Sequence, residues 1–185
     1  AAITTSIKFV PSVIVLPQRQ VPLVAKQIAT VDRLSGGRLT VAVGVGWKHA
    51  EYEAMGADFR ARGAMLVEQV DVMRRLLTEP IVSYSGRFHT LDQVGINPLP
   101  DRPIPVWLGT RGSDAALRRV IEIADGWMPL IMVGVDPYPV AERVHRLRQL
   151  CEDAGRDPAS LPIWGRIYID PSDGWRKEAE TAAEL

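Results

Sequence analysis

The sequence has few of the residues that mark several common classes of protein. Cys151 is the single cysteine among 185 residues, so the chain forms no intramolecular disulfide, and we expect a small buried side chain there. Basic and acidic residues both number 22 and no long basic run occurs, which argues against nucleic acid or an anionic membrane as a partner. No membrane-length apolar run and no signal peptide are recognisable, so the default expectation is a cytoplasmic protein.

Histidines are also scarce, and their spacing does not predict a metal site. His49, His89 and His145 have no metal-ligand spacing and no cysteine partner nearby. We expect His49 and His89 on loops, as surface residues rather than catalysts. His145 lies in a predicted helix with three arginines that we expect on a solvated face: Arg143, Arg146 and Arg148.

Apolar, β-branched runs alternate with segments whose apolar residues recur at helical spacing. Five such strand–helix units predict an α/β protein with a parallel sheet, forming a single domain over 1–185. Five units fit either an open doubly wound sheet or part of an eightfold barrel, since a complete barrel takes roughly 250 residues. The predicted strands are 7–16, 39–43, 105–108, 127–133 and 161–169, and the predicted helices are 21–34, 59–77, 115–124, 137–154 and 175–185.

Segment 81–105 interrupts this alternation. Ser85-Gly86 separates short polar and aromatic stretches, which indicates a β-hairpin or another excursion from the sheet. Four prolines in 97–105 then predict an extended loop.

The buried run 39–43 ends in Gly44-Val45-Gly46-Trp47. Ligands of α/β proteins bind at the carboxyl ends of the strands, and glycine lets the backbone turn sharply or lets a ligand approach it. The motif therefore predicts part of a binding site with Trp47 as a wall. The alternative is a tight turn with an aromatic side chain packed on top.

A second glycine motif, Gly109-Thr110-Arg111-Gly112-Ser113, joins a predicted strand to a helix. Free backbone N–H groups and the positive end of a helix bind phosphate, and Arg111 either adds charge or points to solvent. The alternative is a glycine turn in which the Ser113 side chain caps the helix.

Several motifs resemble the luciferase-like monooxygenase superfamily, most closely its F420-dependent oxidoreductase branch. They include Pro17-Gln18-Arg19, the stretch 29–38, Gly44–Trp47, Tyr84–Phe88, Pro105–Gly109 and Asp125-Gly126-Trp127. The resemblance implies a (β/α)8 TIM barrel in which 7–16 is the third strand and 161–169 the seventh. The first two units and the last strand would then be lacking, so we expect the sequence to be the central piece of a longer chain.

The resemblance also implies a cofactor and its contacts. A cis peptide bond at Ser12-Val13 would support the cofactor's ring system, although Ser12 is otherwise read as a polar residue of a barrel interior. Gly44, Val45, Gly46 and Trp47 would lie beside the ring, and the loop of Gly109, Thr110, Arg111, Gly112 and Ser113 would hold the phosphate. Related sugar-phosphate dehydrogenases carry a glutamate where this chain has Trp47, which argues against that chemistry.

Three functions remain open at this point. The first is hydride transfer between coenzyme F420 and a small organic molecule, and the second is oxygen activation with reduced FMN. The third is a non-catalytic flavin-binding protein. The resemblance further implies a homodimer, and the catalytic residues are unknown, since the family's usual acid or base would precede this sequence.

Overall fold

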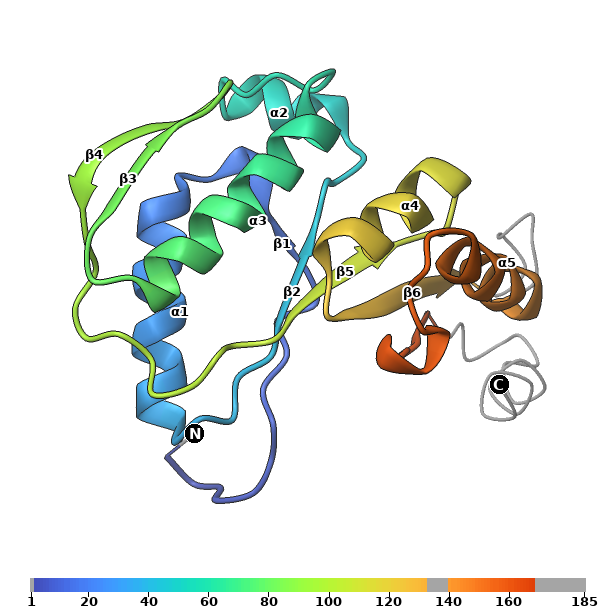
Figure 1. Cartoon of the computed structure of the whole chain (residues 1–185), viewed down its shortest axis with the longest axis horizontal. Coiled ribbons are helices and arrows are strands. Elements are labelled where there is room, and N and C mark those ends of the chain that lie inside the picture. Colours follow the sequence, from blue (N-terminus) through green and yellow to red (C-terminus); the bar gives the residue numbers. More distant parts are fainter. Residues whose placement is uncertain (1, 133–139, 169–185) are drawn as a thin grey trace. The chain divides into compact units, whose positions relative to one another are not determined.

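The computed structural model describes residues 2–132 and 140–168, and the chain forms two compact units, 1–106 and 107–185 (Figure 1). The predicted helix 175–185 lies outside the described residues. Within the described part of the chain, no helix has an apolar stretch long enough to cross a membrane.

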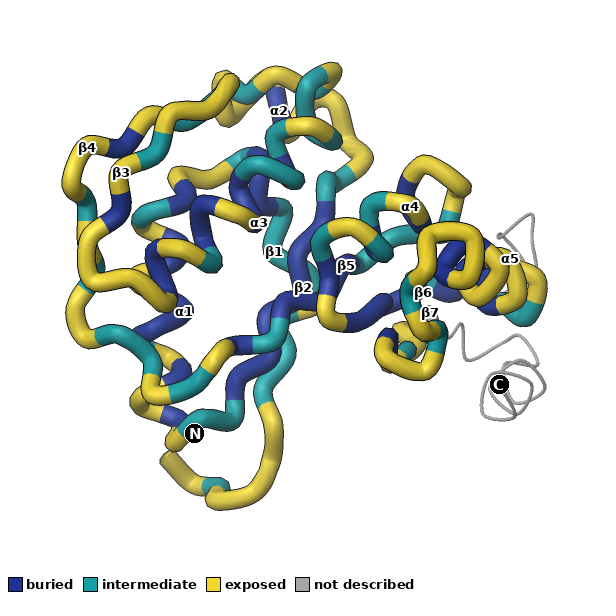
Figure 2. Tube along the Cα trace, in the orientation of Figure 1, coloured by how far each residue is buried: buried dark blue, intermediate teal, exposed yellow. Residues whose placement is uncertain are grey.

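The first unit is built on two short parallel strands, β1 (Ile14–Val15) and β2 (Val41–Gly44), with Ile14 paired to Val43. The predicted strand 7–16 is shorter than expected. Only Phe9 makes a further bridge, to Leu39, and Pro11 lies between this bridge and β1 with no N–H to donate. Strand β2 is buried along its whole length, as its apolar sequence predicts (Figure 2).

Helices of the first unit cover this core. Helix α1 (Val21–Ser35) ends at Gly36, whose φ of 68° gives the left-handed cap that the glycine pair predicts. The short helix α2 (His49–Ala54) follows β2, and α3 (Arg62–Thr78) packs against α1 and the 3-10 turn η1 (Leu16–Gln18). An antiparallel hairpin of β3 (Val82–Ser85) and β4 (Thr90–Val94) occupies part of segment 81–105.

An ion pair between the half-exposed Arg102 and the buried Asp32 holds the turn between α1 and β2. The Arg102 guanidinium lies 2.7 Å from the Asp32 carboxylate and donates to the Leu39 carbonyl at 2.7 Å. Asp32 is buried, so this pair ties the proline-rich loop that contains Arg102 to the amino-terminal end of β2. The contact gives this turn a structural role.

The second unit contains three parallel strands in the order β5 (Val106–Thr110), β6 (Gly126–Met132) and β7 (Arg166–Tyr168). Helix α4 (Asp114–Ile123) connects β5 to β6, α5 (Val140–Asp153) follows, and a 3-10 turn η2 (Pro158–Ser160) precedes β7. The repeated strand–helix order with parallel pairing is the α/β architecture that the sequence predicts.

Candidate cofactor site

The turn after β2 uses the first predicted glycine motif. Gly46 has a φ of +66°, a conformation that favours glycine, and a Cβ added there would lie 2.9 Å from Val15 Cγ1 of the neighbouring strand. The place of its missing side chain is therefore filled by the protein itself. The tight-turn interpretation explains Gly46, while Gly44 belongs to the buried strand.

Tyr52 of α2 stabilises this turn, a role that no local pattern in the sequence indicates. Its hydroxyl donates a hydrogen bond of 2.5 Å to the Val45 carbonyl, and its ring packs edge-on against Phe59 with 5.3 Å between centroids. Burial raises the pKa of Tyr52 to about 12, opposed by the positive charge of Arg62 and reinforced by Glu51. The phenol therefore stays protonated and keeps the Val45 carbonyl fixed.

Trp47 projects outward at the end of the same turn. Its side chain is 73% exposed, and the Lys48 ammonium lies 5.1 Å from the ring centroid. This exposure differs from the alternative of an aromatic cap packed on the turn. An uncovered indole at the carboxyl end of a buried strand offers an apolar face on which a planar ring system can stack.

Two other predicted residues precede β1. The Ser12–Val13 peptide bond is cis, the bond that the family resemblance implies at this place. Ser12 is exposed rather than enclosed, and Val13 is half-buried. Both lie in the first unit with Gly44–Trp47.

The second glycine motif forms the loop between β5 and α4, in the second unit. Gly112 has a φ of +93°, and its N–H donates to Thr110 Oγ1 at 3.3 Å. Ser113 is the N-cap residue, but its side chain makes no capping hydrogen bond; its carbonyl instead accepts the N–H groups of Ala116 and Leu117 at 2.8 Å. The Ser113 hydroxyl is thus not used as the predicted cap.

Two arginines of α5 contact this loop and the first turn of α4. Arg143 is only 5% exposed and donates to the Arg111 carbonyl at 2.6 Å, so the expectation that it lies on a solvated face is wrong. It falls on the apolar stripe of α5 with Val140, Val144 and Leu147, and that spacing is the signal that predicts its burial. Arg146 is more exposed and pairs with Asp114 in the first turn of α4.

His89 lies on the loop between β3 and β4, as expected, but it is half-buried in a clamp with Glu68 rather than on the surface. His89 Nδ1 lies 2.8 Å from Glu68 Oε1 of α3, and the Glu68 carboxylate also accepts the backbone N–H groups of residues 87–89. His49 is exposed as expected, but it is the first residue of α2 rather than part of a loop, with Nδ1 3.5 Å from Glu53. His145 is exposed on α5. No two of the three histidines are brought together by a contact in the described residues.

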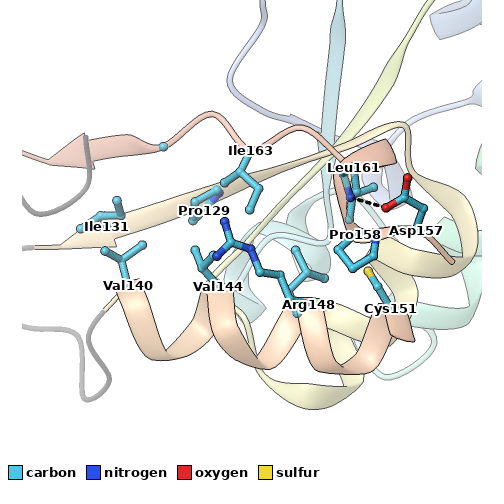
Figure 3. A pocket seen from close by; sticks show the side chains of 13 residues that line it. Pro129, Ile131, Val140, Val144, Arg148, Cys151, Asp157, Pro158, Leu161 and Ile163 are labelled. Atoms are coloured by element: carbon cyan, nitrogen blue, oxygen red, sulfur yellow. Dashed lines mark hydrogen bonds between the residues drawn. The ribbon is translucent and has the colours of Figure 1, made fainter. Parts of the chain in front are cut away.

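A cavity of about 550 Å³ lies between α5, strand β6 and the segment 157–165 that precedes β7 (Figure 3). Apolar side chains such as Ile131, Val144 and Ile163 line it, together with Arg148 and Asp157. Cys151 also lines it, as a buried thiol whose pKa is raised by burial, in agreement with the prediction of a buried cysteine. None of the predicted site residues lines this cavity.

The parallel strands joined by helices, with glycines at the strand ends, define an α/β protein. Comparison with known proteins identifies its family. Residues 1–174 match the model of the luciferase-like monooxygenases, and the chain belongs to that family. An uncharacterised protein of Mycobacterium tuberculosis (strain H37Rv) is 36% identical over 155 residues, which cover 84% of this chain and 52% of that protein. Pyrimidine monooxygenase RutA of Escherichia coli (O127:H6) is 32% identical over 164 residues, covering 85% of this chain and 45% of RutA.

Solved structures share the fold. An F420-dependent secondary alcohol dehydrogenase in complex with an F420–acetone adduct superposes with a TM-score of 0.77 at 23% identity, over 97% of this chain and 55% of that one. The F420-dependent tetrahydromethanopterin reductase of Methanopyrus kandleri gives a TM-score of 0.74 at 22% identity, over 89% and 50%. The chain spans about half the length of the curated relatives it matches.

Proposed function

We propose that this chain is the central part of an oxidoreductase that transfers a hydride between the deazaflavin coenzyme F420 and a small organic molecule. The observation that carries the proposal is the family match over residues 1–174. The motifs that resemble the F420-dependent branch favour the deazaflavin over FMN. When bound, the deazaflavin ring supplies the hydride or accepts it.

The family resemblance assigns residues of each unit to one part of such a cofactor. In the first unit, the exposed indole of Trp47 and the backbone of Ser12, Val13 and Gly44–Gly46 would contact the ring system. In the second unit, the loop from Gly109 to Ser113 would hold the phosphate, because it leads into the amino terminus of α4, where N–H groups and the helix dipole favour an anion. We assign no general acid or base among these residues.

A second candidate is a monooxygenase that activates oxygen with reduced FMN. The likeness to pyrimidine monooxygenase RutA at 32% identity favours it. Both candidates use the same two loops. They differ in the cofactor and in the fate of the reducing equivalents, so one set of measurements separates them.

Fluorescence quenching measures the affinity of the protein for F420 and for FMN, and turnover is followed with each reduced cofactor. Tighter binding of F420 and its oxidation by an organic substrate would support the first candidate. Oxygen uptake with reduced FMN, and no turnover with reduced F420, would replace it with the second. Flavin binding without any turnover would indicate a non-catalytic binding protein.

We also propose that the protein is a homodimer, as the family resemblance implies. Sedimentation equilibrium over a range of concentrations gives the mass directly. A mass that stays at one chain at all concentrations would refute the dimer.

A further inference from the structure

Two buried side chains of the second unit hold the backbone of the loop from Gly109 to Ser113. Trp127 Nε1 donates to the Thr110 carbonyl at 3.3 Å, and Arg143 Nη1 donates to the Arg111 carbonyl at 2.6 Å. Trp127 is fully buried, and Arg143 nearly so. The same two side chains flank Gly112, where an added Cβ would lie 3.1 Å from Arg143 Cδ and 3.2 Å from the Trp127 ring.

These contacts fix the direction of the loop's N–H groups. In a trans peptide the carbonyl of one residue and the N–H of the next point in opposite directions. Because Trp127 binds the Thr110 carbonyl, the Arg111 N–H points away from Trp127, and because Arg143 binds the Arg111 carbonyl, the Gly112 N–H points away from Arg143. The Gly112 N–H donates to Thr110 Oγ1 at 3.3 Å, so an anion at this loop would take the place of that hydroxyl oxygen on the side of the loop away from Arg143.

The arginines of α5 also set the charge around this loop. Arg143 carries a permanent positive charge in a buried position, where charges act through a lower dielectric than in water. Asp114, at the start of α4, is a carboxylate that would repel an anion there. Arg146 binds it through Nε and Nη2, which offsets its charge and holds the pKa of Asp114 below its usual range.

We propose that Arg143 is a positioning residue for the cofactor phosphate. It holds the Arg111 carbonyl so that the loop N–H groups face the phosphate, and it adds positive charge behind them without touching the ligand itself. This inference rests on the proposed function, because it takes the loop from Gly109 to Ser113 to be the phosphate site.

The test uses Arg143→Gln, Arg143→Lys and the control Arg118→Gln, which removes an exposed arginine of α4. Inorganic phosphate is titrated while the amide NMR shifts of residues 110–113 are followed. Fluorescence quenching then compares FMN with riboflavin, which lacks the phosphate. If the protein prefers the deazaflavin, F420 is compared in the same way with its phosphate-free chromophore.

We expect Arg143→Gln to weaken phosphate and FMN binding about tenfold, the size of one hydrogen bond to a charged group, and to leave riboflavin affinity unchanged. Arg143→Lys keeps the charge but not the planar fork, so it should recover part of the loss. Arg118→Gln should bind all three probes as the wild type does. A structural role alone would weaken riboflavin and FMN equally.

Equal loss of FMN and riboflavin binding in Arg143→Gln, or no loss of either, would overturn the inference. If that variant does not fold, the lysine variant decides: FMN affinity equal to that of the wild type would refute the role of Arg143. If the wild type binds neither flavin nor deazaflavin, the proposed function fails, but the phosphate titration still tests Arg143. Phosphate shifts at 110–113 that are lost in Arg143→Gln would support it, and their absence from the wild type would refute it.

Discussion

The partly buried carboxylate of Glu68 gives the sharpest prediction about stability. Its Oε2 accepts the Arg87 N–H at 2.8 Å, and its Oε1 accepts the N–H groups of Phe88 and His89 at 2.9 and 2.7 Å. His89 Nδ1 adds a fourth contact, and the Glu68 side chain is 11% exposed. One side chain of α3 therefore holds the whole turn of the β3–β4 hairpin.

Removing this carboxylate should lower the free energy of unfolding. A hydrogen bond to a charged group contributes about 1.5–3 kcal/mol, but such contributions are not additive at one acceptor. Arg87 is exposed, so water replaces part of what its N–H loses. We therefore expect Glu68→Ala to lower the free energy of unfolding by about 2–4 kcal/mol. Glu68→Gln keeps one oxygen but turns an NH2 group toward the Arg87 N–H, so we expect a loss of about 1–2 kcal/mol.

The dependence on pH has a definite sign. Burial raises the pKa of Glu68, but the hydrogen bonds from His89 and from the three backbone N–H groups outweigh burial and hold the pKa below its ordinary value. The stabilisation is therefore present above the carboxyl pKa of the unfolded chain and is lost as the pH falls through the lower, folded value. The difference between wild type and Glu68→Gln should shrink in acid.

Urea unfolding at several pH values and hydrogen exchange at the amides of residues 87–89 measure these effects. Glu79→Ala, which removes an exposed glutamate just after α3, is the matched control and should change the free energy of unfolding by less than about 0.5 kcal/mol. The clamp would be refuted if Glu68→Ala left exchange at 87–89 at the wild-type rate, or if its cost equalled that of the control.

Of three other predictions, two are also measured by urea unfolding and the third by thiol alkylation. Gly46→Ala should lower the free energy of unfolding by about 2–3 kcal/mol and Gly36→Ala by about 1 kcal/mol, because both glycines have positive φ but only a Cβ at Gly46 would meet a neighbouring side chain. Equal losses in urea unfolding would contradict the packing argument. Arg102→Met removes the ion-pair partner of the Asp32 carboxylate and should lower the free energy of unfolding by about 2–3 kcal/mol, less than the loss of a fully buried pair because Arg102 is 34% exposed. A change near zero would show that the pair is not coupled to folding. Cys151 should react with iodoacetamide slowly in the native protein and rapidly in denaturant, since burial shields the thiol and raises its pKa; fast native alkylation would disprove its burial.

The sequence predicted helix bounds well where they depend on apolar spacing and capping residues nearby in the chain. Helix α1 begins and ends within a residue of its predicted bounds, because its apolar spacing and the glycine cap both act over a single turn. The first and last strands are shorter than 7–16 and 161–169, because a strand's length depends on pairing with residues far along the chain. Residues 158–160 form a 3-10 turn, η2, that no apolar pattern indicates.

Contacts between residues that are far apart in the sequence could not all be predicted from local patterns. Glu68 and His89 are 21 positions apart, and nothing near either residue indicates that the carboxylate binds the hairpin turn. Arg143 is different, because its spacing from Val144 and Leu147 places it on the buried stripe of α5. The charge of its side chain argued for solvent, but its Nη1 donates to the Arg111 carbonyl of the loop.

The glycines of the two loops show that packing within the protein, and not only a ligand, can favour a glycine motif. A Cβ on Gly46 would meet Val15, and one on Gly112 would meet Arg143 and Trp127, so in both loops the protein itself occupies the side-chain position. The positive φ and the packing beneath the loop favour glycine at both positions, whether or not a ligand lies above it. Loss of cofactor affinity in a Gly112 variant would therefore report damage to that packing, whereas Arg143→Gln adds no atoms beneath the loop and separates phosphate from ring binding.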